Sequence, residues 1–158
     1  MNLTRLTVIA LACVLAGCGP ANYIMMTESM APAIEKGDIM AIDMAAYRQE
    51  APAIGDIVAY HAPDDRKGKL LMGRVVALAG DTVRVEEGSL HRNSEPVEEP
   101  YVSGEVSYDV EETAVPEGHI YILGDNRDEA RDSRAFGPVP PEHVSGRIVD
   151  VQKPPGSE

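Results

Sequence analysis

Glycine and proline interrupt this sequence at short intervals, and this spacing restricts the chain to short elements. The 158 residues include 14 glycines and 12 prolines. The stretches between them carry apolar alternation or brief apolar runs rather than helical periodicity. Strands are expected at residues 39–44, 56–61, 70–79, 82–86, 118–123 and 147–151, with a hairpin turn at 87–88 and one helical turn at 140–143. Many short strands joined by turns predict an all-β protein, a sandwich or an open barrel.

Composition excludes several classes of function. Lys and Arg number 14 against 26 Asp and Glu, for a net charge of −12, so no basic surface for nucleic acid is expected. Apolar residues make up 44% of the chain, which fits one packed domain. The histidines are His61, His91, His119 and His143. Their spacing does not suit metal ligation, and no glycine-rich segment has the setting of a phosphate-binding loop, so no metal or cofactor is expected.

The N-terminal residues predict an export signal that ends in a lipid attachment site. Arg5 precedes the apolar run 6–14, which is shorter than the about 20 residues that a membrane-spanning helix needs. The next residues, Leu15-Ala16-Gly17-Cys18, resemble the lipobox of bacterial lipoproteins. This resemblance implies cleavage before Cys18, acylation of Cys18 and a domain on the extracytoplasmic side of a bacterial membrane. Gly19 in place of aspartate favours the outer membrane.

The predicted organisation has four parts. They are a signal peptide at 1–17, an anchor and tether at 18–26, a β domain at 27–151 and a disordered tail at 152–158. Residues 95–113 are acidic, contain prolines and lack a strand pattern, so an exposed insertion is expected there. Both cysteines precede the domain, which must therefore be stabilised by its core without a disulfide.

Four sets of residues point to one enzyme family by their order and spacing. They are Ser29-Met30-Ala31-Pro32, then Gly37-Asp38 with Gly55-Asp56-Ile57-Val58, then residues 74–81, and last the segment 124–137, which contains Gly-Asp-Asn-Arg and Asp-Ser-Arg. On local chemistry alone, the last segment would be a polar loop whose side chains cap backbone groups. Taken together, the four sets resemble the type I signal peptidases, membrane-bound serine endopeptidases that remove signal peptides from exported proteins.

The resemblance implies a fold and a set of roles. The fold would consist of coiled antiparallel β-sheets with little helix and a groove in which an extended peptide lies as an added strand. Ser29 would be the nucleophile of a Ser–Lys dyad. The Ser29 backbone N–H and the Thr27 hydroxyl would form the oxyanion hole. The residues that brace this site would be Asp125, Asn126, Asp132, Ser133 and Arg134.

Two positions depart from the family pattern. Gly73 stands where the lysine base is expected, and Ala130 stands where a serine would orient that lysine. Lys69 and Lys67 share a strand face with position 73. Lys69 lies four residues away, which is roughly 13 Å and about twice the reach of a lysine side chain. Only a bulge or a register slip would bring either lysine to Ser29.

Three interpretations follow. The first is an active signal-peptidase-like serine endopeptidase, weak or unorthodox, whose base comes from Lys69, Lys36 or a histidine. The second is a non-catalytic homologue that binds extended peptides or regulates a partner enzyme such as a catalytic paralogue. The third is a β-domain lipoprotein with a purely structural role.

Overall fold

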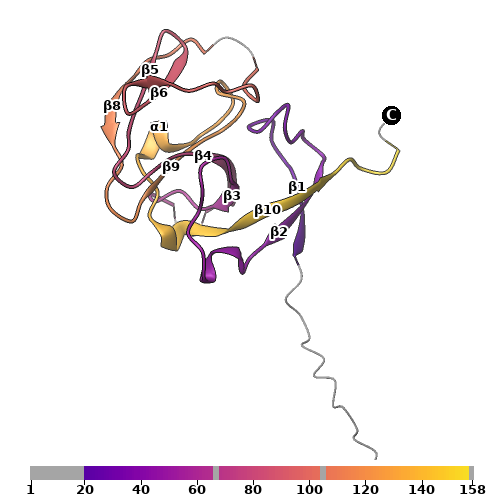
Figure 1. Ribbon diagram of the computed structural model, residues 1–158. Helices are drawn as coiled ribbons and strands as arrows, with labels where there is room; N and C mark the ends of the chain where they lie inside the picture. The colour runs from indigo at the N-terminus through magenta and orange to yellow at the C-terminus, as the bar shows by residue number, and fades with distance from the viewer. Residues whose placement is uncertain (1–19, 66–67, 104–105, 157–158) are drawn as a thin grey trace, which may run out of the picture.

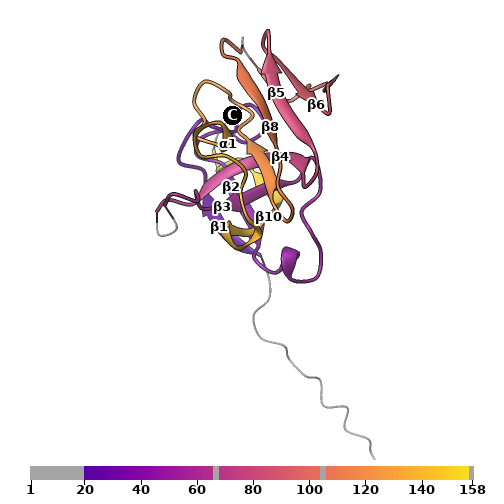
Figure 2. The ribbon, with the colours of Figure 1, turned by 90° about the vertical axis from the view of Figure 1, so that its left-hand side faces the viewer.

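The computed structural model describes residues 20–65, 68–103 and 106–156, which form two antiparallel sheets (Figures 1 and 2). The predicted signal peptide, Cys18 and Lys67 lie outside these residues. In spatial order, the six-stranded sheet contains β1 (Ala21–Ile24), β2 (Ile39–Asp43), β10 (Val144–Gln152), β3 (Ile57–Tyr60), β4 (Leu71–Leu78) and β9 (Ile120–Leu123). The four-stranded sheet contains β7 (Glu95–Pro96), β6 (Ser89–Arg92), β5 (Thr82–Glu86) and β8 (Val110–Ala114).

The all-β prediction is confirmed, and each of the six predicted strands overlaps an observed strand. Helix is limited, within the described residues, to one turn of α-helix, α1 (Ser133–Phe136), and two 3₁₀ turns, η1 (Ala46–Arg48) and η2 (Pro141–His143). The predicted turn at 140–143 corresponds to η2. No helix in these parts of the chain has the length and apolarity needed to cross a membrane.

Three strands, β1, β7 and β8, lie where the sequence predicted none, whereas β6 follows the predicted hairpin turn at 87–88. β7 lies inside the predicted insertion 95–113. β1 falls inside the predicted tether and pairs with β2, so the ordered domain includes residues before 27. β8 begins inside the predicted insertion 95–113 and pairs with β5 at the edge of the smaller sheet. Each lies at the edge of its sheet and is largely exposed. Exposed edge strands need no apolar alternation, since the neighbouring strand supplies their hydrogen bonds.

β4 connects the two sheets, and adjacent residues of this strand point to opposite faces of the first sheet. Near its end, Val76 and Ala77 pack against Val83 and Val85 of β5, which joins the sheets through one apolar cluster. Because strand residues point alternately to opposite faces, Gly73 shares a face with Val75, while Arg74 points to the other side. This alternation separates the two halves of the site described below.

Candidate functional site

Ser29 lies on the loop 25–38 between β1 and β2. Two backbone hydrogen bonds join the ends of this loop. The Met25 N–H donates to the Asp38 carbonyl at 2.9 Å, and the Gly37 N–H donates to the Met25 carbonyl at 2.8 Å. Met30 and Ile34 are fully buried in an apolar cluster under the first sheet. The loop is therefore anchored by its own apolar residues.

Ser29 itself is held on both sides. Its hydroxyl oxygen lies 3.0 Å from the Thr27 hydroxyl oxygen, which is hydrogen-bond distance. Its carbonyl accepts a hydrogen bond from the Asn126 N–H at 3.1 Å. The structure thus brings together three of the predicted site residues, although they come from segments about 100 positions apart in the chain.

The segment 124–134 follows β9 and folds back along it through side-chain hydrogen bonds. Asp132 accepts from the Gly124 N–H at 3.0 Å, and Ser133 accepts from the Ile122 N–H at 3.0 Å. The Arg134 guanidinium donates to both carboxylate oxygens of Asp132, at 2.7 and 2.8 Å. The side chains of Ser133 and Asp132 therefore satisfy one backbone N–H in β9 and one directly after it.

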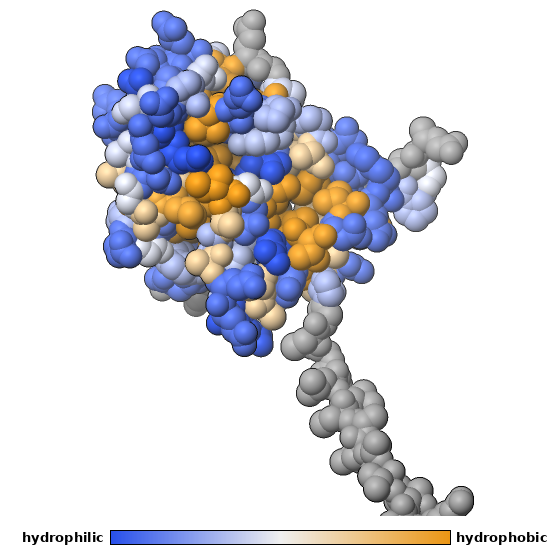
Figure 3. Space-filling model, viewed as in Figure 1, coloured by the Kyte–Doolittle hydropathy of each residue, from blue (hydrophilic) through white to orange (hydrophobic). Residues whose placement is uncertain are grey.

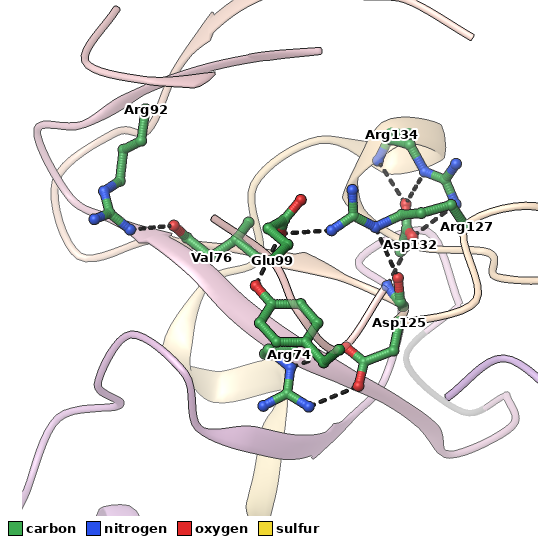
Figure 4. Close-up of polar contacts among 10 residues, drawn as sticks. Arg74, Val76, Arg92, Glu99, Asp125, Arg127, Asp132 and Arg134 are labelled. Carbon is green, nitrogen blue, oxygen red and sulfur yellow. Dashed lines mark hydrogen bonds and ion pairs between the residues drawn. The ribbon is translucent and has the colours of Figure 1, made fainter. Parts of the chain in front are cut away.

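Arg74 fixes Asp125 from the neighbouring strand (Figure 4). Its guanidinium donates to the two carboxylate oxygens at 2.9 and 2.6 Å, and it also donates to the Gly55 carbonyl at 3.2 Å. Burial lowers the pKa of Arg74, but hydrogen bonding to Asp125 and the charge of that carboxylate raise this pKa more. Asp125 is 1% exposed, so this bidentate pair is a strong constraint on the residue before Asn126.

A second set of contacts comes from the segment predicted to be an exposed insertion. The Glu99 carboxylate accepts from Arg127 at 2.6 Å and from the Tyr101 hydroxyl at 2.8 Å. The Tyr101 ring lies 4.1 Å from the Arg74 guanidinium carbon. Burial, together with the charge of Glu99, raises the pKa of Tyr101, so this phenol keeps its proton. Sequence reasoning missed these residues; the only signal was an aromatic residue within an acidic stretch.

Gly73 lies at the same end of β4 and β9 as Ser29. It comes one residue before Arg74, which pairs with Leu123, so Gly73 and Gly124 are the next opposed positions. A Cβ at Gly124 would lie 2.7 Å from the Ser29 carbonyl oxygen and 2.2 Å from the Ala130 Cβ. The two departures from the family pattern, Gly73 and Ala130, therefore face the same small region beside Ser29.

Neighbouring atoms occupy the space that a side chain at position 73 would take. A Cβ at this position would lie 2.4 Å from Cγ2 of Ile122 and 3.3 Å from Cε1 of Tyr60. Both neighbouring side chains are fully buried. Burial, together with the charge of Asp132, raises the pKa of Tyr60, so its phenol stays protonated at neutral pH.

The lysines that could substitute for the base are not joined to Ser29. Among the described residues, neither Lys36 nor Lys69 shares a hydrogen bond with the Ser29 hydroxyl, and both are exposed. Lys69 precedes the first residue of β4. Lys153 instead pairs with Glu35 and Asp38, at 2.6 and 3.2 Å.

The histidines lie in other parts of the fold. The His61 N–H donates to the His143 carbonyl at 2.9 Å, next to η2. His91 is on the smaller sheet, and His119 precedes β9. In the described parts of the chain, no three His, Cys, Asp or Glu side chains are grouped so that they could hold a metal ion.

Comparisons with known proteins agree with this geometry. The family model described as signal peptidase, peptidase S26 matches residues 1–151. The chain is 32% identical over 129 residues to the probable signal peptidase I-1 of Synechocystis sp. strain PCC 6803, covering 78% of this chain and 66% of that protein. It is 31% identical over 145 residues to signal peptidase I V of Bacillus subtilis strain 168, covering 83% and 84%.

Two further relatives extend the comparison. The thylakoidal processing peptidase 1 of Arabidopsis thaliana is 35% identical over 138 residues, which are 82% of this chain and 41% of that protein. Several relatives are therefore longer than the part of them that this chain spans. A crystal structure of a signal peptidase I from Enterococcus faecalis V583 superimposes with a TM-score of 0.52 and 30% identity, over 63% of this chain and 98% of that chain.

Proposed function

Because the chain belongs to the signal peptidase family S26, we propose that it binds extended, signal-peptide-like segments at Ser29 and cleaves them only very slowly. The observation that carries this proposal is the glycine at position 73. Ile122 occupies the space that a side chain at this position would need. A nucleophilic serine needs a base within hydrogen-bond reach, and this site offers none in the family's place.

The part of the site around Ser29, here called the nucleophile half, supports peptide binding. The Thr27 hydroxyl lies beside the Ser29 hydroxyl, where it can donate to an oxyanion. The Asn126 N–H fixes the Ser29 carbonyl, so the orientation of this loop does not depend on a lysine. A peptide carbonyl could therefore be polarised at this site without being attacked efficiently.

Exposed apolar side chains on the chain segment that precedes Ser29 support an apolar, extended ligand. Tyr23, Ile24 and Met26 are 37%, 59% and 71% exposed, on β1 and directly after it. Figure 3 shows apolar surface in the region of β1, β2 and β10. β1 is also an edge strand of its sheet, and an edge strand can accept a peptide as a further strand.

Lipid attachment at Cys18 is part of this proposal. β1 begins at Ala21, three residues later. Three residues span at most about 10 Å, so a lipid on Cys18 would hold the start of β1 close to a membrane surface. Mass spectrometry of the mature N-terminus tests this part: an acylated Cys18 supports it, and a chain that begins elsewhere contradicts it.

A non-catalytic role is the alternative, and the paired loss at Gly73 and Ala130 favours it over a purely structural role. Both positions are replaced while the Asp132 and Arg134 bracing is complete. A domain that binds peptide without turnover could present it to, or withhold it from, a catalytic paralogue.

Calorimetric titration with a signal-like peptide tests the proposal. We expect the unaltered protein and Ser29→Ala to bind with similar affinity, since the bracing contacts do not involve the Ser29 hydroxyl. A peptide with bulky residues at the expected cleavage point is the control and should bind more weakly. Absence of binding by both forms at millimolar peptide would contradict the proposal.

A further inference from the structure

We propose that Glu99 and Tyr101, here called the clasp, position Ser29 from the smaller sheet. The clasp lies between β7 and β8, and its side chains contact two arginines beside the site (Figure 4). Its effect on peptide binding rests on the proposed function, whereas its effect on backbone order does not. The geometry assigns the clasp two series of contacts, here called routes, that connect it to the Ser29 carbonyl.

The first route passes through Arg127. Its Nη2 donates to Glu99 at 2.6 Å, and its Nε donates to the Gly124 carbonyl at 3.0 Å. The side chains of Arg127 and Glu99 are 2% and 8% exposed, so each charge depends on the other for compensation. Gly124 packs directly on the Ser29 carbonyl, since a Cβ at this position would lie 2.7 Å from the Ser29 carbonyl oxygen. Glu99 therefore fixes Gly124 against Ser29.

The second route passes through Arg74. The Tyr101 ring covers one face of its guanidinium, and the Tyr101 hydroxyl is held by Glu99. Stacking limits the guanidinium to the plane in which it meets both Asp125 oxygens. Asp125 directly precedes Asn126, whose N–H donates to the Ser29 carbonyl. The two routes therefore converge on one backbone hydrogen bond.

The clasp is itself ordered locally. The Val102 N–H donates to the Glu99 carbonyl at 3.0 Å, which closes a turn around Tyr101. One carboxylate oxygen, Oε1 of Glu99, accepts from both the tyrosine and the arginine. Substitution of this single carboxylate should therefore loosen both routes together.

Amide hydrogen exchange at Asn126 tests the clasp directly. Glu99→Gln should speed exchange of the Asn126 amide about tenfold relative to the Val139 amide, which bonds to the Ile120 carbonyl. Tyr101→Phe removes one hydrogen bond and keeps the ring, so it should fold readily and give a smaller increase. Glu98→Gln, at the adjacent exposed glutamate, is the matched control and should leave exchange unchanged.

A second measurement separates positioning from general destabilisation. If Glu99 acts through Arg127, the effects of Glu99→Gln and Arg127→Met on Asn126 exchange should not add. Additive effects, or equal acceleration at Asn126 and Val139, would overturn the clasp. Where the unaltered protein binds signal-like peptide, Tyr101→Phe should also weaken that affinity about threefold. An unaltered protein that binds no peptide contradicts the proposed function, while the exchange data still decide the clasp.

Discussion

The site has two halves: the nucleophile half around Ser29 and the base half around Gly73. They differ in how many polar contacts hold them in place. Around Ser29, a backbone hydrogen bond from Asn126 joins the segment 124–134 to the loop 25–38. The segment is itself held by the ion pair between Arg74 and Asp125 and by the bond from the Gly124 N–H to Asp132. Around Gly73, apolar side chains occupy the space of the expected base. Under the proposed function, this difference means that the contacts that hold Ser29 in place are independent of the group that would activate it.

The separation has a simple geometric cause on β4. Gly73 and Arg74 are adjacent, and adjacent strand residues face opposite sides of the sheet. Position 73 faces the base region, while position 74 reaches Asp125. Under the proposed function, a change at position 73 would therefore remove the base without disturbing the ion pair between Arg74 and Asp125.

Rebuilding the base half should give the largest effect. Loss of one member of a nucleophile–base pair costs on the order of 10⁴–10⁶ in kcat, so partial recovery of about 10²–10⁴ is expected. The variant combines Gly73→Lys, Ala130→Ser and Ile122→Leu, the last because it removes the branched methyl that meets a Cβ at position 73. Cleavage of a signal-like peptide is the measurement.

The same triple variant with Ser29→Ala is the control and should be inactive. A triple variant that folds and binds peptide, yet shows no Ser29-dependent cleavage, would count against the assignment of Gly73 as the vacated base position.

Breaking the support of the nucleophile half should cost stability instead. Arg74→Met leaves Asp125 buried without its cation, which should lower the free energy of unfolding by about 3–5 kcal/mol. Arg131→Met is the matched control, because both partners of the Arg131–Asp64 pair are 53% exposed and such pairs contribute about 0–1 kcal/mol. Urea denaturation measures both, and equal losses would contradict the distinction.

Gly124→Ala probes the contact between the halves. Its Cβ would meet Ala130 at 2.2 Å and the Ser29 carbonyl at 2.7 Å, so overpacking should cost about 1–3 kcal/mol. Adding Ala130→Gly removes one of the two clashes and should recover part of that loss. No recovery in thermal unfolding would mean that the strain arises elsewhere.

The smallest effect is expected at Tyr60, in the base half. Its hydroxyl is buried and, among the described residues, has no hydrogen-bond partner. Tyr60→Phe should therefore raise the free energy of unfolding by about 1 kcal/mol. Tyr101→Phe, which removes a bond to Glu99, should lower it by a similar amount. A clear loss of stability in Tyr60→Phe would reveal an unrecognised partner of that hydroxyl.

The sequence predicted elements whose stability is visible in their own residues. β5 was predicted because Val83 and Val85 alternate with polar residues and face the core. β8 was not, because its exposed Glu111 and Glu112 give no apolar pattern and its partner β5 supplies its hydrogen bonds. Edge strands of this kind are determined by tertiary pairing rather than by local pattern.

The site was predictable to a similar degree. Ser29 and Asn126 belong to recognisable motifs, and the structure places them in contact. The role of Glu99 was not predictable, because its partner Arg127 is 28 positions away and no periodicity connects them. Long-range polar pairs depend on the complete fold and have no signature in a local window.

Single-turnover cleavage of a signal-like peptide by the unaltered protein, compared with Ser29→Ala at saturating protein, tests the central claim most directly. The account predicts that both forms bind the peptide and that any Ser29-dependent rate stays below about 10⁻³ s⁻¹, four orders of magnitude under a typical kcat of about 10 s⁻¹. Ser29-dependent cleavage near that typical value would contradict it, because an efficient base would then act on Ser29 from somewhere other than position 73.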